Sequence, residues 1–149
     1  MEFSIKGGDL SKLKTDCVIV GVFDSKKLST AATALDKASR GAILAAVASG
    51  DISGKFGSTL ILQAVAGITA KRVLLVGYGN DKDYSNKIFV KSLSAAFKAL
   101  RNTAATDVAI ALNTKHAISD IAWKVEQAAV LAIEGAYRFN QMKSKVDSL

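Results

Sequence analysis

The turn Gly77-Tyr78-Gly79 follows an apolar run and comes just before a helical pattern. Strand, glycine turn and helix in this order are typical of sites that hold a nucleotide diphosphate. That fingerprint requires a third glycine three residues after the second, and position 82 is Lys82. Asp81 and Asp83 stand where the anion would dock, and no acid follows at the spacing expected of a ribose ligand. We therefore predict that both glycines let the chain leave the strand with positive φ, around an empty loop.

A second glycine-rich stretch, GDISGKFGS at 50–58, contains the pair Gly54-Lys55. A phosphate-cradling loop needs a glycine five residues before this pair and a Ser or Thr directly after the lysine. Ser49 and Phe56 occupy those two positions. The stretch is therefore predicted to be a loop without a phosphate site.

Nucleophilic catalysis needs a nucleophile beside a base, and the sequence offers only Cys17 and His116 for such a dyad. A buried apolar cysteine and a loop histidine are the alternative interpretation. One His and one Cys exclude a structural zinc site. A metal site made of carboxylates alone stays open, but the acids are dispersed apart from Asp81 and Asp83, which we interpret as solvated acids of a turn. Trp123 is explained by helix packing. Residue chemistry alone thus predicts no catalytic, cofactor-binding or metal-binding residue.

The hydrophobic pattern predicts the elements that surround these residues. Segments 17–23 and 71–77 are apolar on both faces, as buried central strands are. Strand 2–6 is expected at an edge of the sheet. We expect strands at 2–6, 17–23, 58–65, 71–77 and 107–112, and helices at 29–49, 84–101 and 119–141.

The helical segments carry apolar faces at helical spacing. In 29–49 the predicted face contains Ala31, Ala34, Leu35 and Ala38, with Ser29 as N-cap, an interruption at Gly41 and a C-terminal cap at Gly50. In 84–101 the face consists of Phe89, Leu93, Ala96, Phe97 and Leu100. Helices that follow short buried strands predict a three-layer α/β domain with a mixed, mostly parallel sheet flanked by helices.

Composition narrows the class of protein. The chain has 149 residues, half of them hydrophobic, and a net charge of +7 from 20 basic and 13 acidic residues. Such an excess indicates either a solvated lysine-rich surface or binding to nucleic acid or another acidic partner. The single cysteine, the absence of a signal-like segment and apolar runs too short to cross a bilayer predict a soluble, cytoplasmic protein without a membrane partner.

Five stretches occur in a fixed order: FSIKGGD, CVIVGVF, GDISGKFGSTLIL, KRVLLVGYGN and EGAYRFNQMKSK. Together they resemble the N-terminal domain of the leucyl aminopeptidase (cytosol aminopeptidase) family, over nearly the whole chain. The most specific parts are the glycine loop at 50–57, the strand and turn at 72–79, and a segment with Gly135, Tyr137, Phe139 and Lys143.

The resemblance implies a macrodomain-like domain at 1–142 without catalytic residues, and at 143–149 the start of a linker to a catalytic domain that lies outside this chain. The family's enzymes are two-domain metallopeptidases. Their C-terminal domain binds two divalent metals, zinc or manganese, and releases residues such as leucine from peptide N-termini. Six subunits assemble, with the N-terminal domains outside. The family's metal ligands have no matching position in this sequence, so none is assigned.

The expected role is therefore non-catalytic, in the assembly and regulation of a leucyl aminopeptidase. The expected partners are its own catalytic domain and the other subunits of a hexamer. Three alternatives remain open. The basic surface is compatible with a DNA-binding module, since some bacterial members of the family bind DNA partly through this domain. Fold analogy suggests binding of ADP-ribose. A stand-alone hydrolase is the enzyme-class alternative.

Overall fold

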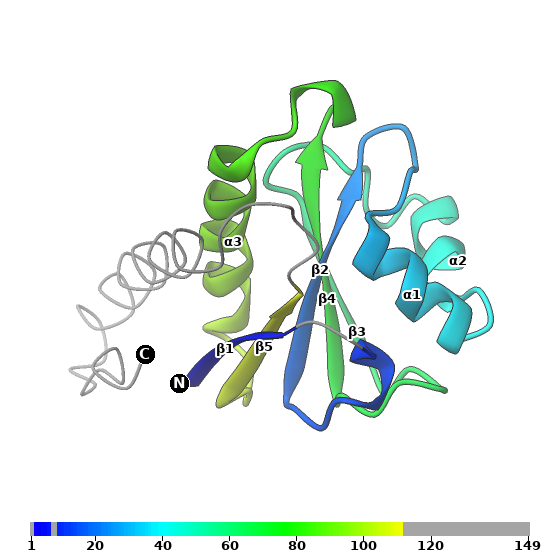
Figure 1. The fold of residues 1–149 in the computed structure, drawn as a ribbon, viewed down its shortest axis with the longest axis vertical. Helices are drawn as coiled ribbons and strands as arrows, with labels where there is room; N and C mark the ends of the chain where they lie inside the picture. The colour runs from blue at the N-terminus through cyan, green and yellow to red at the C-terminus, as the bar shows by residue number, and fades with distance from the viewer. Residues whose placement is uncertain (1, 7–8, 112–149) are drawn as a thin grey trace.

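The centre of the fold is a five-stranded sheet, in the part of the chain that the computed structural model describes, residues 2–6 and 9–111. The strand order is β1-β5-β2-β4-β3, and only the β3–β4 pair is antiparallel. The predicted mixed, mostly parallel sheet is confirmed (Figure 1). The strands are β1 (Glu2–Lys6), β2 (Cys17–Phe23), β3 (Thr59–Gln63), β4 (Arg72–Gly79) and β5 (Asp107–Ala111).

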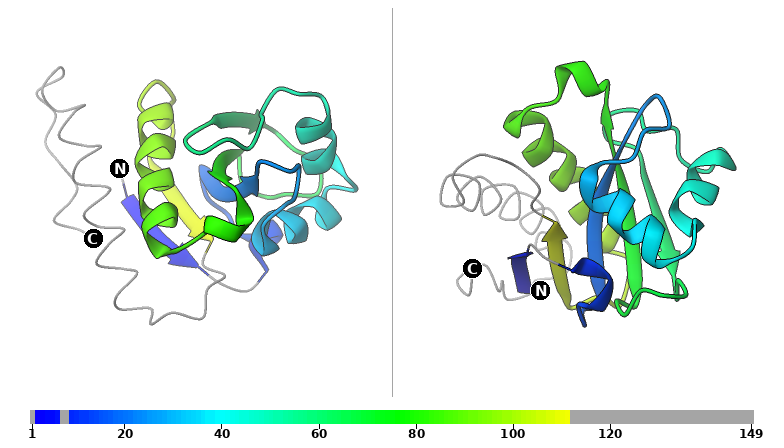
Figure 2. Two further views of the ribbon diagram at one scale, coloured as in Figure 1. Left: turned by 90° about the horizontal axis from the view of Figure 1, so that it is seen from above. Right: turned by 45° about the vertical axis from the view of Figure 1, so that its right-hand side comes forward.

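Helices cover both faces of this sheet and make the three layers expected of the α/β class (Figures 1 and 2). The helices α1 and α2 lie on one face, and α3 lies on the other. The helical bounds are η1 (Leu10–Lys12), α1 (Thr30–Ala38), α2 (Ala42–Ala48), η2 (Asp81–Asp83) and α3 (Asn86–Leu100).

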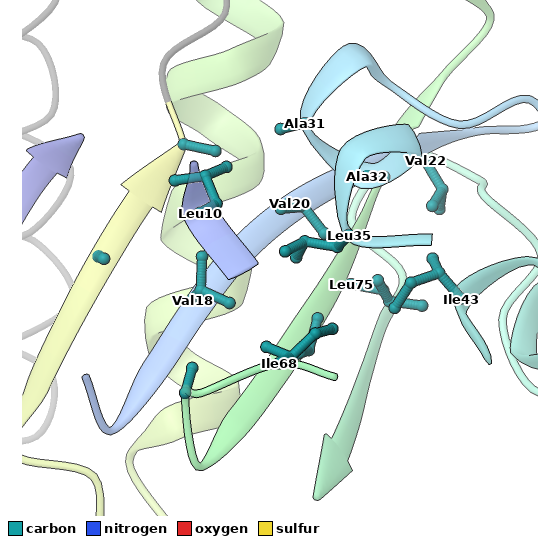
Figure 3. Close-up of a cluster of buried hydrophobic side chains, with 14 of the residues drawn as sticks. Leu10, Val18, Val20, Val22, Ala31, Ala32, Leu35, Ile43, Ile68 and Leu75 are labelled. Atoms are coloured by element: carbon teal, nitrogen blue, oxygen red, sulfur yellow. The ribbon is translucent and has the colours of Figure 1, made fainter. Parts of the chain in front are cut away.

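The central strand β2 is buried along its whole length because both of its faces contact a helical layer. Successive side chains point to opposite faces of a strand. Val18 and Val20 therefore join the cluster under α1 and α2 (Figure 3), whereas Cys17 and Ile19 join the cluster under α3. This arrangement explains the run of apolar residues in segment 17–23.

The predicted helix at 29–49 is divided into α1 and α2. Arg40 takes φ +58° and Gly41 takes φ +92°, and these two successive left-handed residues end the first helix. Because Gly41 has no side chain to cap α2, Asp36 does so from α1, accepting a hydrogen bond from the Leu44 amide at 2.8 Å. The predicted apolar face was wrong at one position: Ala34 is exposed, and Ala32 is buried instead.

The apolar stripe of α3 is confirmed, since all five predicted residues are buried against the sheet. The helix begins two residues later than predicted because Ser85 is its N-cap, accepting a hydrogen bond from the Ile88 amide at 3.3 Å.

Strand β3 is shorter than predicted because Ala64 takes φ +51° and turns the chain. The predicted edge position of strand 2–6 is confirmed. The predicted helix at 119–141 and the tail at 143–149 lie outside the described residues.

Candidate functional site

The carboxyl ends of β2 and β4 are the place where this topology would hold a ligand. After β2 the chain passes to α1 on one face, and after β4 it passes to α3 on the opposite face (Figure 2). In open α/β sheets, ligands bind outside the carboxyl ends of strands at such a divergence. We call this region, formed by the ends of β2 and β4 and the loop at 50–58, the carboxyl edge.

The two glycines of the turn have different roles there. Gly79 takes φ +78°, as predicted for a residue that lets the chain leave the strand. The same prediction for Gly77 was wrong, because Gly77 lies within β4 and is not among the positive-φ residues. Gly77 is required for close approach: a Cβ atom at this position would collide with the carbonyl oxygen of Lys55 and the hydroxyl of Ser58.

Carbonyl groups of the loop at 50–58 accept hydrogen bonds from the backbone amides of β4 that a phosphate would need. The Gly77 amide donates to the Ser58 carbonyl at 2.7 Å, and the Gly79 amide donates to the Gly54 carbonyl at 3.0 Å. Phosphate-binding turns hold their ligand through backbone amides that point at it. Both glycine amides of this turn are already engaged within the chain.

The Gly54-Lys55 stretch is a loop, as the sequence predicted. Gly54 takes φ +81° and lies so close to β2 that a Cβ atom would collide with the Phe23 carbonyl. The Lys55 carbonyl accepts hydrogen bonds from the Ser58 amide at 3.0 Å and the Ser58 hydroxyl at 2.6 Å. The loop is thus folded against the sheet instead of standing open around an anion.

A hollow of about 280 Å³ lies at the carboxyl edge, between the start of α1 and the segment that leads into α3. Its aromatic wall is a cluster of three rings, with centroids 5.5 Å apart for Phe23–Tyr78, 5.5 Å for Phe23–Tyr84 and 4.8 Å for Tyr78–Tyr84. The three rings pack against one another and form one side of the hollow. The other lining residues are Lys27, Leu28, Ser29 and Thr30.

The ionisable groups that line the hollow are two phenols and one lysine. Burial raises the pKa of Tyr84 to about 12 and that of Tyr78 well above its ordinary value, so both phenols stay neutral at physiological pH. The Lys27 ammonium lies 2.9 Å from the Asp81 carboxylate and holds the pKa of that carboxyl below its usual value. The lysine that lines the hollow is therefore already paired.

Cys17 lies at the other end of β2, away from the carboxyl edge. Its side chain is fully buried, and burial raises the pKa of the thiol to about 12. A thiol with such a pKa is mostly protonated near neutral pH. The burial confirms the interpretation of Cys17 as an apolar core residue. His116 itself and Trp123 lie outside the described residues.

Within residues 2–6 and 9–111, no group of three or more His, Cys, Asp or Glu residues could hold a metal ion. Asp81 and Asp83 belong to η2, where Asp81 contacts Lys27 and Asp83 is exposed. No helix in the same described part of the chain has the length and apolarity needed to cross a membrane.

Sequence reasoning missed a pair of carboxylates at the amino ends of β2 and β5, which we call the carboxylate clasp. Asp16 accepts hydrogen bonds from the amide and the hydroxyl of Thr106, both at 2.8 Å. In return, Asp107 accepts from the Asp16 amide at 3.0 Å. The bonds from Thr106 hold the pKa of Asp16 far below its usual range. No sequence signal reveals the pair, because 91 residues separate the two acids.

The layers and strand order define a macrodomain-like α/β domain. The macrodomain of Thermus aquaticus DarG matches 86% of this chain and 90% of its own, with a TM-score of 0.64 and 9% identity. A mutant of tomato leucine aminopeptidase matches 98% of this chain and 30% of its own, with a TM-score of 0.68 and 21% identity. At these identities, the two structures show the fold alone.

The family follows from the sequence comparisons. The family model for the cytosol aminopeptidase family, N-terminal domain, matches residues 19–146. A probable cytosol aminopeptidase of Methylobacillus flagellatus is 47% identical over 146 residues, which cover 97% of this chain and 29% of the relative. The chain therefore belongs to the cytosol aminopeptidase family, as the N-terminal domain, and the predicted resemblance is confirmed. It spans 29–30% of the length of other curated relatives that it matches.

Proposed function

We propose that this chain is a non-catalytic N-terminal domain that serves the assembly and regulation of a leucyl aminopeptidase. The family match at residues 19–146 carries the proposal. Two features of the carboxyl edge support it: the amides of Gly77 and Gly79 are engaged by the loop at 50–58, and the hollow contains neutral phenols and a paired lysine. A catalytic centre would need groups other than these.

The catalytic chemistry of the parent enzyme is assigned to the part of the protein that follows this domain. Two divalent metal ions, zinc or manganese, would act there as Lewis acids and release N-terminal residues such as leucine from peptides. The described residues of this chain present no cluster of ligands for such a pair of metals. The proposed setting is a cytoplasmic hexamer.

Two preparations test whether catalysis requires the part of the protein outside this chain. They are the full-length protein and the 149-residue chain, each with added Mn²⁺ or Zn²⁺. We expect the full-length protein to hydrolyse leucine amides and the isolated chain to give no turnover above the metal-only blank. Metal-dependent hydrolysis by the isolated chain would show that it contains an active site. The role in assembly predicts that full-length protein sediments as a hexamer and that protein lacking residues 1–149 forms smaller species.

A second proposed function is binding of double-stranded DNA through the basic surface. The observation that favours it is the net charge of +7, which ion pairs within the chain do not reduce. The ion pairs of the described residues engage only three lysines: Lys12, Lys27 and Lys71. Fluorescence anisotropy with a labelled duplex tests this function, and absence of binding at low salt would exclude it.

A further inference from the structure

Four basic residues lie on the outer face of α3 and its C-cap, and we call them the basic ridge: Lys87, Lys91, Lys98 and Arg101. All four are exposed. At about 100° per residue, they lie within an arc of about 80°. The buried stripe of α3 points the opposite way, toward the sheet. The ridge is therefore a single line of cations on the outside of the α3 layer.

Nothing described in the structure neutralises these four cations. Helix α3 contains no acidic residue, and none of the ion pairs within residues 2–6 and 9–111 includes a residue of the ridge. Lys87 also stands in the first turn of α3, at the positive end of the helix dipole, and Lys91 is one turn away. Both placements oppose helix stability by a few tenths of a kcal/mol. Lys98, in the last turn, and Arg101, at the C-cap, are at the end where cations stabilise a helix. Helix stability therefore accounts for the second pair of charges but not for Lys87 and Lys91.

We propose that the basic ridge is the surface of this domain that contacts the phosphate backbone of double-stranded DNA, an inference that rests on the proposed DNA-binding function. From Lys87 to Arg101 the ridge is about 21 Å long at 1.5 Å per residue. Over that length a duplex presents about 12 phosphates. A straight, rigid line of four cations matches this continuous row of charge.

The surroundings of the ridge favour a phosphate backbone over an acidic protein partner. Protein interfaces are anchored by large apolar or aromatic side chains at their centre. The large hydrophobic residues that are exposed in the described part of the chain are Leu44 and Phe56, which lie on α2 and in the loop at 50–58. The ridge lies on a different element and provides charge alone. Contacts of lysine with phosphate carry no base information, so the binding is expected to be independent of sequence.

The decisive experiment compares two triple variants of the full-length protein that change net charge equally. The ridge variant combines Lys87→Gln, Lys91→Gln and Lys98→Gln. The control variant combines Lys14→Gln, Lys37→Gln and Lys55→Gln, three exposed lysines on other elements. The measurement is anisotropy of two labelled duplexes of unrelated sequence from about 50 to 200 mM salt, with labelled polyglutamate as the acidic-peptide probe.

We expect the ridge variant to lower the slope of log K against log salt by about 2.7, because each phosphate that a lysine no longer neutralises reduces the slope by about 0.9. The control variant should lower it by less than about 1.

Equal slopes in the two variants, with wild-type binding intact, would overturn the assignment of the ridge as the DNA contact and leave the DNA-binding function standing. No duplex binding by the wild type would overturn both. A ridge-dependent preference for polyglutamate would assign the ridge to an acidic protein segment and also overturn the proposal. Circular dichroism and aminopeptidase activity show whether each variant is folded.

Discussion

Different kinds of hydrogen bond hold the chain together at the two ends of the parallel strands. At the carboxyl edge, the loop at 50–58 lies directly on the backbone of β4, and uncharged hydrogen bonds from Gly77 and Gly79 hold it. At the amino ends, the carboxylate clasp of Asp16 and Asp107 joins β2 to β5 through charged side chains. The first closure leaves no room for a side chain but does not depend on pH. The second depends on ionised groups.

The difference also bears on whether an anion could bind at the carboxyl edge. An edge that is to bind an anion must keep its backbone amides available. Here the loop has taken them, so ADP-ribose binding gains no support from the geometry even though the fold resembles that of a macrodomain. Similarity of fold thus leaves the function of the edge undetermined.

The largest expected effect comes from Gly77→Ala at the carboxyl edge. The new Cβ atom would meet backbone atoms of Lys55 and Gly54, which cannot move without displacing the loop. We expect a loss of about 3 kcal/mol in the free energy of unfolding, measured by urea denaturation. The matched control is Gly57→Ala in the same loop, where open space surrounds the new atom and φ +84° alone costs about 1 kcal/mol. Equal losses would show that close approach is not the constraint.

The carboxylate clasp predicts the next largest effect. Asp16→Asn removes the charge from two hydrogen bonds with Thr106, and we expect a loss of about 2 kcal/mol at neutral pH. Because the folded state lowers the pKa of Asp16, the stabilisation is complete above the unfolded pKa of about 3.9 and declines as the pH falls below it. The difference between wild type and variant should therefore shrink in urea titrations at about pH 3. A difference that is constant with pH would contradict the clasp, and Asp51→Asn, an exposed acid, provides the control.

A smaller effect is expected from Ser92→Ala on α3. The buried Ser92 hydroxyl donates to the Gly77 carbonyl at 3.3 Å, and that carbonyl also accepts from the Gly57 amide at 3.1 Å. Because one partner of the carbonyl remains, we expect a loss of about 1 kcal/mol or less in thermal or urea unfolding. A loss as large as that of Gly77→Ala would mean that α3, and not the loop, holds the end of β4.

The smallest effect is expected at the ion pair beside the hollow. Lys27→Gln breaks the contact with Asp81, but 61% of the lysine side chain and 34% of the aspartate side chain are exposed. Exposed ion pairs contribute little because water and salt screen them. The unfolding midpoint should stay within experimental error in both low and high salt. A clear salt-dependent loss would show that the hollow is less solvated than its exposure indicates.

The sequence predicted those features that depend on local pattern. The buried stripe of α3 was predicted residue by residue, because a period of 3.6 residues is visible in a single segment. The central position of β2 was predicted from an apolar run on both faces. The error at Ala34 is of the same local kind: a nine-residue helix is too short for its spacing to fix which side faces the sheet.

Two features that the sequence did not predict depend on contacts between distant segments. The role of Gly77 comes from the carbonyl of Lys55, which lies 22 positions earlier in the chain. The clasp joins Asp16 to residues about 90 positions away. The hydrophobic pattern of a single segment contains no information on contacts with residues far away in the sequence.

The position of β1 has a consequence for synthesis on the ribosome. In the described sheet, β1 pairs with β5, which lies between it and β2. About 100 residues separate the two strands, so at about 5–20 residues per second the first strand waits about 5–20 s for its neighbour. During that interval β2, β3 and β4 can pair, while β1, which is synthesised before the other four strands, is the last of the five to join the sheet. Nascent chains halted before and after residue 111 emerges should therefore differ in protection of the amides of Glu2–Lys6.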